Sequence, residues 1–393
     1  MPLDAISESP ILSLIDQIFQ LRQRGESVLG LHIGEPDFET PVGIRDAAYR
    51  AMNDGYTHYV SAQGIPELRT AIAARLRTRN RLPAEPGDVV VMTAKFAIYA
   101  TLLATVTPGD EVLLPDPTYL FEQPVQLAGG RPVYVPLRPD FGLDVDALRS
   151  AVTPRSRLLI LVSPANPTGR VLRPNEIRAA LEIARDHRLT VVSDETYESL
   201  IYEGQHVSPA SLAGAEVPVV TIGSFSKLYA MTGWRAGYAA APSEIRGRLV
   251  KVMEHTLSCL PPFIQRACLW ALENAGSDEA RFRDTFRARR DHLIARLAAV
   301  PGLRTVVPEG AFYVFPRYEL EMPSLEFCAR LLSEEKLAVV PGVAFGPHGE
   351  GHVRISYSSP IEALDDGVDR LARFLARHGS PVRVPGPNAQ RLF

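Results

Sequence analysis

The sequence contains few cysteines and no long apolar run. Only 3 of its 393 residues are cysteines, and no two of them form a CxxC pair, so we expect no metal site and no disulfide framework. This cysteine usage fits a reducing compartment, and we expect a cytoplasmic protein. No apolar stretch reaches the roughly 20 residues that a membrane helix needs, so no membrane association is expected. Asp4 and Glu8 interrupt the N-terminal segment, which argues against a signal peptide.

The sequence also lacks a basic excess. Its net charge is −3, and no basic cluster with interleaved aromatic residues occurs, so a nucleic-acid binder is not expected. The arginine run at Arg287, Arg289 and Arg290 is interpreted as a solvated helix face. No internal repeat is visible. A chain of 393 residues with 46% hydrophobic content predicts a large globular domain and a smaller one.

Strands and helices alternate through the middle of the chain. We predict strands at residues 88–92, 111–114, 131–136, 158–162, 189–192, 219–222 and 235–240. Helices are predicted at residues 42–53, 66–79, 94–103, 119–128 and 175–187. Apolar strands separated by amphipathic helices are typical of a mostly parallel sheet that is covered on both faces. The predicted fold class is therefore α/β, with a seven-stranded sheet.

The pattern changes in the last third of the chain. Residues 251–274 are predicted to be helical with a break at Pro261 and Pro262, and a long helix follows at residues 278–299. Short strands at 305–307, 311–315 and 353–357 and helices at 324–335 and 361–377 predict a smaller α+β domain built from both termini. The expected parts are an N-terminal arm with part of the small domain (1–45), a large domain (46–285), a small domain (286–378) and an irregular tail (379–393).

Polar residues follow five of the predicted strands. In parallel sheets, ligands bind beyond the carboxyl ends of the strands. The segments in question begin at Thr93, Pro115, Ser163, Ser193 and Gly223. We therefore expect one binding site at this edge of the sheet.

Lys227 is the most informative of these residues. It stands among Ser, Thr and Gly directly after a β-branched strand. A partly desolvated amine can form an imine with a carbonyl cofactor. Ser224, Ser226 and Arg235 offer hydroxyl and guanidinium donors for a phosphate. The alternative is a lysine at a strand end that is capped by serines.

Seven segments in a fixed order resemble one known family. They are Gly34-Glu35-Pro36-Asp37-Phe38, Tyr59 with residues 64–69, residues 163–169, Asp194-Glu195-Thr196-Tyr197, residues 224–238, residues 309–313 and residues 353–357. Over residues 5–377 the chain resembles the class I aminotransferases among the fold-type I pyridoxal-phosphate enzymes, nearest the prokaryotic aspartate aminotransferase branch. The resemblance implies the cofactor pyridoxal 5′-phosphate, an L-amino acid (aspartate or glutamate) and a 2-oxo acid as substrates, and a homodimer with shared active sites.

The resemblance also implies roles around the cofactor. Lys227 would form the imine and then move the proton from the substrate Cα. Asp194 would keep the pyridine nitrogen protonated, although a helix cap or a buried ion pair is the alternative. Tyr197 and Asn166 would hydrogen-bond the ring oxygen, and Tyr119 would stack on the ring. Asn166 is otherwise a turn residue, and Tyr119 otherwise a core aromatic residue.

Other residues are implied in phosphate binding. Ser224, Arg235 and the amides of Ala94 and Lys95 would bind the phosphate, with Tyr59 reaching it from the neighbouring subunit. Ala94 follows Thr93 where the family usually has Gly or Ser, but backbone amides can still serve.

Substrate binding is implied for a third group. Arg354 would bind the substrate α-carboxylate, assisted by Asn166 and the Gly34 amide, unless it forms a surface ion pair. Lys95 matches a position where some aspartate-specific relatives bind the side-chain carboxylate. It could equally be a solvated residue at a helix start, and the apolar residues 10–12 could line the same mouth and favour aromatic or aliphatic substrates.

Two further function classes stay open at this point. The same cofactor site could serve a lyase, a cyclase or an oxidase that acts on an amino acid, because function lies in the details of the site. Such folds also occur as regulatory modules fused to DNA-binding domains, but no extra basic domain is present.

Overall fold

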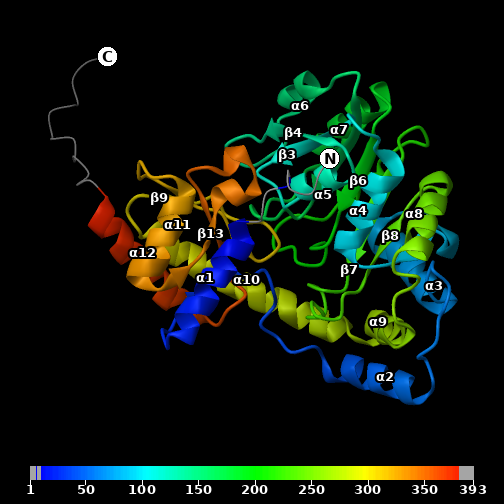
Figure 1. Ribbon diagram of the computed structural model, residues 1–393, viewed down its shortest axis with the longest axis horizontal. Coiled ribbons are helices and arrows are strands. Elements are labelled where there is room, and N and C mark those ends of the chain that lie inside the picture. The colour runs from blue at the N-terminus through cyan, green and yellow to red at the C-terminus, as the bar shows by residue number, and fades with distance from the viewer. Residues whose placement is uncertain (1–5, 7–9, 380–393) are drawn as a thin grey trace.

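A computed structural model describes residue 6 and residues 10–379 (Figure 1). Its main sheet has seven strands in the order β2-β8-β7-β6-β5-β3-β4. All neighbours run parallel except β8, which is antiparallel to both β2 and β7. The strands are β2 (Val89–Val91), β3 (Glu111–Asp116), β4 (Arg131–Pro136), β5 (Ser156–Val162), β6 (Thr190–Asp194), β7 (Val219–Ser224) and β8 (Gly237–Ala240). The predicted seven-stranded, mostly parallel sheet is confirmed.

Helices cover both faces of this sheet because its strands are apolar on both sides. Leu158 and Ile160 share a core cluster with α4 (Ala94–Thr105) and α8 (Ser243–His255). The intervening Leu159 and Leu161 belong to a second cluster with α7 (Pro174–Asp186). Neighbouring side chains of a strand point to opposite faces, so this alternation produces the three-layer arrangement. The other covering helices are α5 (Glu122–Leu127) and α6 (Val145–Ala151).

A third apolar cluster lies at the β2 edge. It joins β2 and β8 to α2 (Val42–Asn53), α3 (Pro66–Arg75) and α9 (Pro262–Asn274). Pro66 occupies the first turn of α3, where the missing amide costs no hydrogen bond. One π-helical turn, η2 (Leu76–Asn80), continues α3. Short 3₁₀ turns are η3 (Pro86–Asp88), η4 (Pro209–Ser211), η5 (Gly342–Phe345) and η6 (Pro347–Gly349).

Both ends of the described chain contribute to the smaller half. β1 (Leu29–Gly30) pairs in parallel with β12 (Leu337–Ala338), and β14 (Val353–Ser356) lies between β10 (Tyr313–Val314) and β13 (Val340–Pro341). β9 (Leu303–Arg304) pairs with β11 (Arg317–Tyr318). The helices of this half are α1 (Pro10–Gln23), α11 (Ser324–Glu335) and α12 (Ile361–His378). This confirms the α+β half built from both termini, while its exact bounds stay a prediction.

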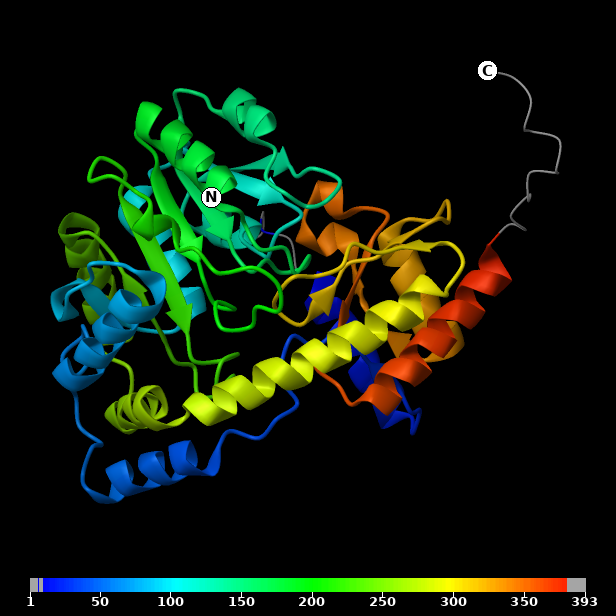
Figure 2. The ribbon, with the colours of Figure 1, turned by 180° about the vertical axis from the view of Figure 1, so that it is seen from behind.

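The long helix α10 (Gly276–Ala298) connects the two halves (Figure 2). Phe282, Phe286, Leu293 and Leu297 recur at helical spacing and are buried in one cluster. The predicted solvated arginine face on this helix is wrong for two of its members, because both have acidic partners. Arg289 donates to both carboxylate oxygens of Asp37 at 2.7 and 2.8 Å, and the buried Arg290 binds Glu203.

Some predicted boundaries are also wrong. The strand predicted at 305–307 lies instead at Leu303–Arg304, where it pairs with β11. The helix predicted from residue 119 begins at Glu122, because a tight turn from Tyr119 to Phe121 precedes it. The helical segment predicted from residue 251 is divided between α8 and α9, and α8 already begins at Ser243. Helix α6 was not expected.

Two predicted features fall outside the described residues. These are residues 1–5 and 7–9 of the N-terminal arm and residues 380–393 of the tail. Within the described part, none of the helices combines the length with the apolar content that would let it cross a membrane.

We predict that Leu293→Ala destabilises the protein. Leu293 is 1% exposed in the cluster that α10 shares with the smaller half, so the substitution leaves a cavity. The free energy of unfolding should fall by about 2–5 kcal/mol in denaturant titrations at fixed protein concentration. Leu325→Ala is the matched control, because Leu325 is 53% exposed. It should change stability by less than about 0.5 kcal/mol. Equal losses for the two variants would contradict the packing assigned to α10.

Candidate functional site

A cavity of about 290 Å³ lies beyond the carboxyl ends of the central strands, where the two halves of the chain meet. Of the twelve residues predicted for the site, eleven line it: Gly34, Ala94, Lys95, Tyr119, Asn166, Asp194, Tyr197, Ser224, Lys227, Arg235 and Arg354. Its size is near the lower end for ligand pockets. The rule that ligands bind at strand ends therefore predicted the location of this cavity.

Lys227 follows β7 and extends toward the loop after β1. Its amine donates a hydrogen bond to the carbonyl oxygen of Gly34. Burial lowers the pKa of Lys227 to about 8, and the positive charges of Arg354 and Arg235 act in the same direction. A sizeable fraction of this amine is therefore neutral near physiological pH, as a nucleophile or a base requires.

Gly34 is needed because the chain passes very close to Tyr313. A Cβ atom at position 34 would lie 2.3 Å from the Tyr313 hydroxyl oxygen. Any side chain here would displace Tyr313 or the carbonyl that accepts from Lys227.

Asp194 ends β6 and is 7% exposed. Its carboxylate accepts from the amide and the hydroxyl of Thr196 at 3.1 and 2.6 Å. Burial raises its pKa, and the neighbouring Glu195 charge adds to this effect. Among the described residues Asp194 has no cationic partner within ion-pair distance. It is therefore suited to a positively charged nitrogen of a bound ligand.

Arg354 is a buried cation on β14. It is 3% exposed, and it donates to Asn166 Oδ1 at 3.0 Å and to the His32 carbonyl at 2.6 Å. Its guanidinium lies 4.5 Å from the Tyr313 ring centre and 5.0 Å from that of Phe345. In the described part of the chain it forms no ion pair, and its Nε has no hydrogen-bond partner. The surface ion pair considered above is therefore excluded, and the site suits a carboxylate.

Two tyrosines form a pair on one wall of the cavity. The hydroxyl oxygens of Tyr197 and Tyr313 are 2.8 Å apart. Burial raises the pKa of Tyr197 well above its usual value and that of Tyr313 to about 12, so both stay protonated at neutral pH. Tyr313 was not predicted as a site residue. Its position at the end of the segment 309–313 was the signal that could have identified it.

Another group of lining residues offers donors for an anion. Ala94 and Lys95 begin α4, and the Thr93 hydroxyl caps that helix by accepting from the Phe96 amide. The first amides of a helix have no partner within the helix and attract anions. Ser224 and Arg235 line the same cavity.

Lys95 and Ile15 also line the cavity. Lys95 is exposed and forms no ion pair with any described residue. The side chains predicted at the mouth, Pro10, Ile11 and Leu12, lie outside those that the structure describes. Ile15, one turn further along α1, lines the cavity instead.

Tyr59 is the one predicted residue that does not join the others. It is 88% exposed and lies outside the cavity of its own chain.

The charges of the cavity fit pyridoxal phosphate. The described residues that line it include four lysine and arginine side chains and one acid, Asp194. A ligand that brings several anionic groups and one protonated nitrogen would balance these charges. Lys227 supplies an amine of lowered pKa for the aldehyde.

Comparisons with known proteins agree with this geometry. The family profile "Aminotransferase class I and II" matches residues 26–371. An aspartate aminotransferase of Pyrococcus abyssi is 42% identical, over 92% of this chain and 95% of the relative. Aromatic-amino-acid aminotransferase 2 of Thermococcus litoralis is 40% identical over 92% and 95%. The aspartate aminotransferase of Thermus thermophilus, solved with maleate, is 37% identical with a TM-score of 0.91 and covers 95% of this chain and 98% of its own.

We predict that Lys227 attaches pyridoxal phosphate covalently in a pH-dependent manner. After borohydride reduction, intact-mass spectrometry should find one adduct on the wild-type chain and none on Lys227→Arg. Because only the neutral amine reacts, the attachment rate should reach half of its maximum near pH 8 and level off about one unit above it. Lys251→Arg, at an exposed lysine, should behave like the wild type. An adduct on Lys227→Arg would contradict the assignment.

Proposed function

We propose that this chain, which belongs to the class I and II aminotransferases and is a pyridoxal-phosphate-dependent enzyme, transfers the amino group of aspartate or glutamate to a 2-oxo acid. The observation that carries the proposal is a buried guanidinium, Arg354, without an acidic partner among the described residues, in the same cavity as a second unpaired cation, Lys95. A dicarboxylic amino acid would supply a carboxylate for each. A lyase, cyclase or oxidase reaction is not favoured.

Arg354 is suited to the α-carboxylate. Its planar guanidinium can bind a carboxylate through two parallel hydrogen bonds. The bonds to Asn166 and to the His32 carbonyl hold it in place before substrate arrives. Lys95 would then bind the side-chain carboxylate. The relative solved with maleate, a dicarboxylate, supports this choice.

The cofactor supplies an electron sink for the bonds at the amino-acid Cα. Ser224, Arg235 and the amides of Ala94 and Lys95 would hold its phosphate. Asp194 would keep a proton on the ring nitrogen, and Tyr197 with Asn166 would hydrogen-bond the ring oxygen. Tyr119 would pack against the ring.

Lys227 would move the proton in each half-reaction. Its Nζ lies against the Gly34 carbonyl, and its lowered pKa allows it to accept a proton from Cα and to give it back at a second carbon. Because Arg354 can bind the α-carboxylate of either an amino acid or a 2-oxo acid, both substrates would use the same site in turn. This predicts ping-pong kinetics.

Aromatic substrates are the second candidate. Ile15, Ile98 and Leu120 give the same cavity an apolar surface. The relative from Thermococcus litoralis is named for aromatic amino acids.

We further propose a homodimer with shared sites. Tyr59 is too exposed to serve its own cavity, and Val42, Tyr49 and Met52 present large apolar side chains on α2. A second copy of the chain is the occupant that would cover this surface and receive Tyr59. The three unpaired cysteines support a cytoplasmic location, which we also propose.

We predict that Lys95→Gln weakens the use of acidic substrates selectively. Loss of a charge-assisted hydrogen bond to the side-chain carboxylate should lower kcat/KM for aspartate and glutamate about 10- to 100-fold. The value for phenylalanine should change less than about threefold, because no anion would face Lys95. Steady-state assays with each donor measure both.

Arg354→Lys provides the contrasting variant. It should lower kcat/KM for acidic and aromatic donors alike, since both carry the α-carboxylate. If Lys95→Gln also lowered kcat/KM equally for acidic and aromatic donors, Lys95 would not select the substrate side chain. If no common amino acid converted the bound cofactor to its amino form, the aminotransferase proposal itself would fail.

We predict that mixed subunits restore activity. Tyr59→Ala and Lys227→Ala homodimers should each be impaired. When subunits of the two variants are mixed, each hybrid dimer has one site in which both Tyr59 and Lys227 are intact. Activity after mild dissociation and mixing should rise toward about a quarter of the wild-type value, as random reassortment gives half hybrids with one intact site each. A monomeric mass by sedimentation would contradict the dimer.

A further inference from the structure

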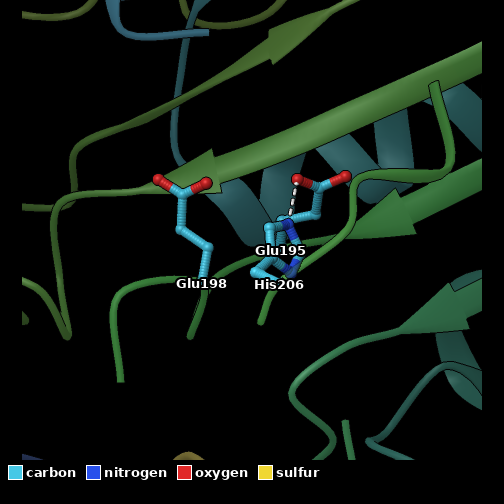
Figure 3. Close-up of side chains that lie close together, drawn as sticks. All are labelled: Glu195, Glu198 and His206. Atoms are coloured by element: carbon cyan, nitrogen blue, oxygen red, sulfur yellow. Dashed lines mark hydrogen bonds and ion pairs between the residues drawn. The ribbon is translucent and has the colours of Figure 1, made fainter. Parts of the chain in front are cut away.

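A second group of charged side chains lies buried behind Asp194. Glu195 is 1% exposed, and Glu198 and His206 lie beside it (Figure 3). Asn80 on η2 donates to both carboxylates, at 2.9 Å to Glu195 and 2.5 Å to Glu198. We call these four residues the Glu195 cluster.

The Glu195 cluster has the composition of a metal site, but its ligand atoms already have partners. One oxygen of Glu195 accepts from the hydroxyls of Ser193 and Ser208 at 2.9 and 2.6 Å. Its other oxygen accepts from Asn80 and from His206 Nε2, the latter at 2.7 Å. A metal ion would have to displace these donors. The cluster is therefore a hydrogen-bonded ion network.

His206 balances the charge of this network. Arg75 on α3 binds Glu198 at 3.1 Å and Glu279 on α10 at 3.4 Å, and Arg79 on η2 also binds Glu279. Three carboxylates thus face two arginines, and a protonated His206 supplies the third positive charge. The other titratable groups that face the network are the phenols of Tyr229 and Tyr238, which burial keeps protonated. The cavity that Asp194 lines also contains the positive charges of Lys227, Arg235 and Arg354.

The shifts in pKa agree with an ionised pair. Burial opposes the charge on His206, yet the Glu195 carboxylate raises its pKa above the usual value. Burial likewise opposes the charge on Glu195, but His206 and the two serine hydroxyls lower its pKa overall. Glu195 is also the neighbouring charge that raises the pKa of Asp194. Without a cation beside it, the negative charge of Glu195 would therefore disfavour the ionisation of Asp194.

The backbone fixes this arrangement. The Glu195 amide donates to the Ile222 carbonyl on β7 at 2.9 Å, and the Ser163 amide donates to the Asp194 carbonyl at 3.1 Å. Asp194 and Glu195 are consecutive residues. These two bonds hold the end of β6 in place, so that Asp194 lines the cavity while Glu195 lies in the network.

We propose that His206 is a positioning residue that, as a cation bonded to Glu195, cancels the charge beside Asp194 and keeps the Asp194 carboxylate ionised toward the cofactor ring. The inference rests on the role proposed for Asp194. It adds that this role depends on a histidine that does not line the cavity.

The test compares His206→Gln with the double variant Glu195→Gln/His206→Gln. Glutamine can still donate to Glu195 but carries no charge. In His206→Gln, Asp194 takes up a proton more readily and the ring nitrogen is less often protonated. Such a ring withdraws less charge from the Lys227 nitrogen, which then holds its proton to higher pH. The midpoint of the absorbance–pH titration of the bound cofactor, without substrate, should rise by about one unit.

The double variant removes both charges and should return the midpoint to within about 0.3 units of the wild type, by the same electrostatic reasoning. In His206→Gln, kcat should fall about tenfold while KM changes little, because Arg354 and Lys95 are untouched. His187→Gln, at an exposed histidine, is the matched control and should match the wild type in each measurement.

Three results would overturn the proposal. They are an unchanged midpoint in His206→Gln, a double variant shifted further than the single one, or an equal shift in His187→Gln. If His206→Gln does not fold, Glu195→Gln alone should leave the midpoint unchanged or lower, and a rise would overturn the proposal. The titration needs no substrate, so an enzyme that fails to transfer amino groups would refute the proposed function and leave this inference standing.

Discussion

Burial of the Lys227 amine and the Arg354 guanidinium, in a cavity whose described lining includes one acid, is the constraint on which the site depends. Burial lowers the pKa of Lys227, and the positive charges of Arg354 and Arg235 add to this effect. Removing such charges from water costs several kcal/mol each unless partners compensate. Among the described residues, the hydrogen bonds that Arg354 donates to Asn166 Oδ1 and to the His32 carbonyl offset part of this cost. An anionic ligand that pairs with these charges would compensate the rest of the cost, and this gain in free energy would favour its binding.

The network behind Asp194 follows a different electrostatic rule. On the cavity side positive charges are left unpaired, whereas on the far side Arg75, Glu195, Glu198 and Glu279 have partners of opposite sign or strong donors. Asp194 lies at the boundary between the two. Its ionisation therefore depends on both sides, and the sheet that holds β5, β6 and β7 together sets the distance between them.

Much of the fold and most of the site could be predicted because the signals were local. Apolar strands followed by polar turns located the edge of the sheet, and Lys227 stood out from its own neighbours in the chain. Arg289, Tyr313 and His206 could not be interpreted in this way. Asp37 and Tyr197, the partners of Arg289 and Tyr313, are 252 and 116 positions away in the chain, and the 11 positions between Glu195 and His206 are irregular chain with no period to follow. Sequence pattern predicts which face of an element is apolar, but not which distant carboxylate neutralises a charge on it.

Helix α10 packs against both halves of the chain and holds them together. Phe282 and Phe286 pack with Phe312 and its neighbours, while Arg289 is tied to Asp37 near the start of the chain. A break in this helix would expose its aromatic side chains to water and separate the buried Arg289 from Asp37. Neither half should therefore survive as a separately expressed fragment. A chimera that exchanges the smaller half with that of a relative would have to carry the whole of α10 and the segment around Asp37 with it.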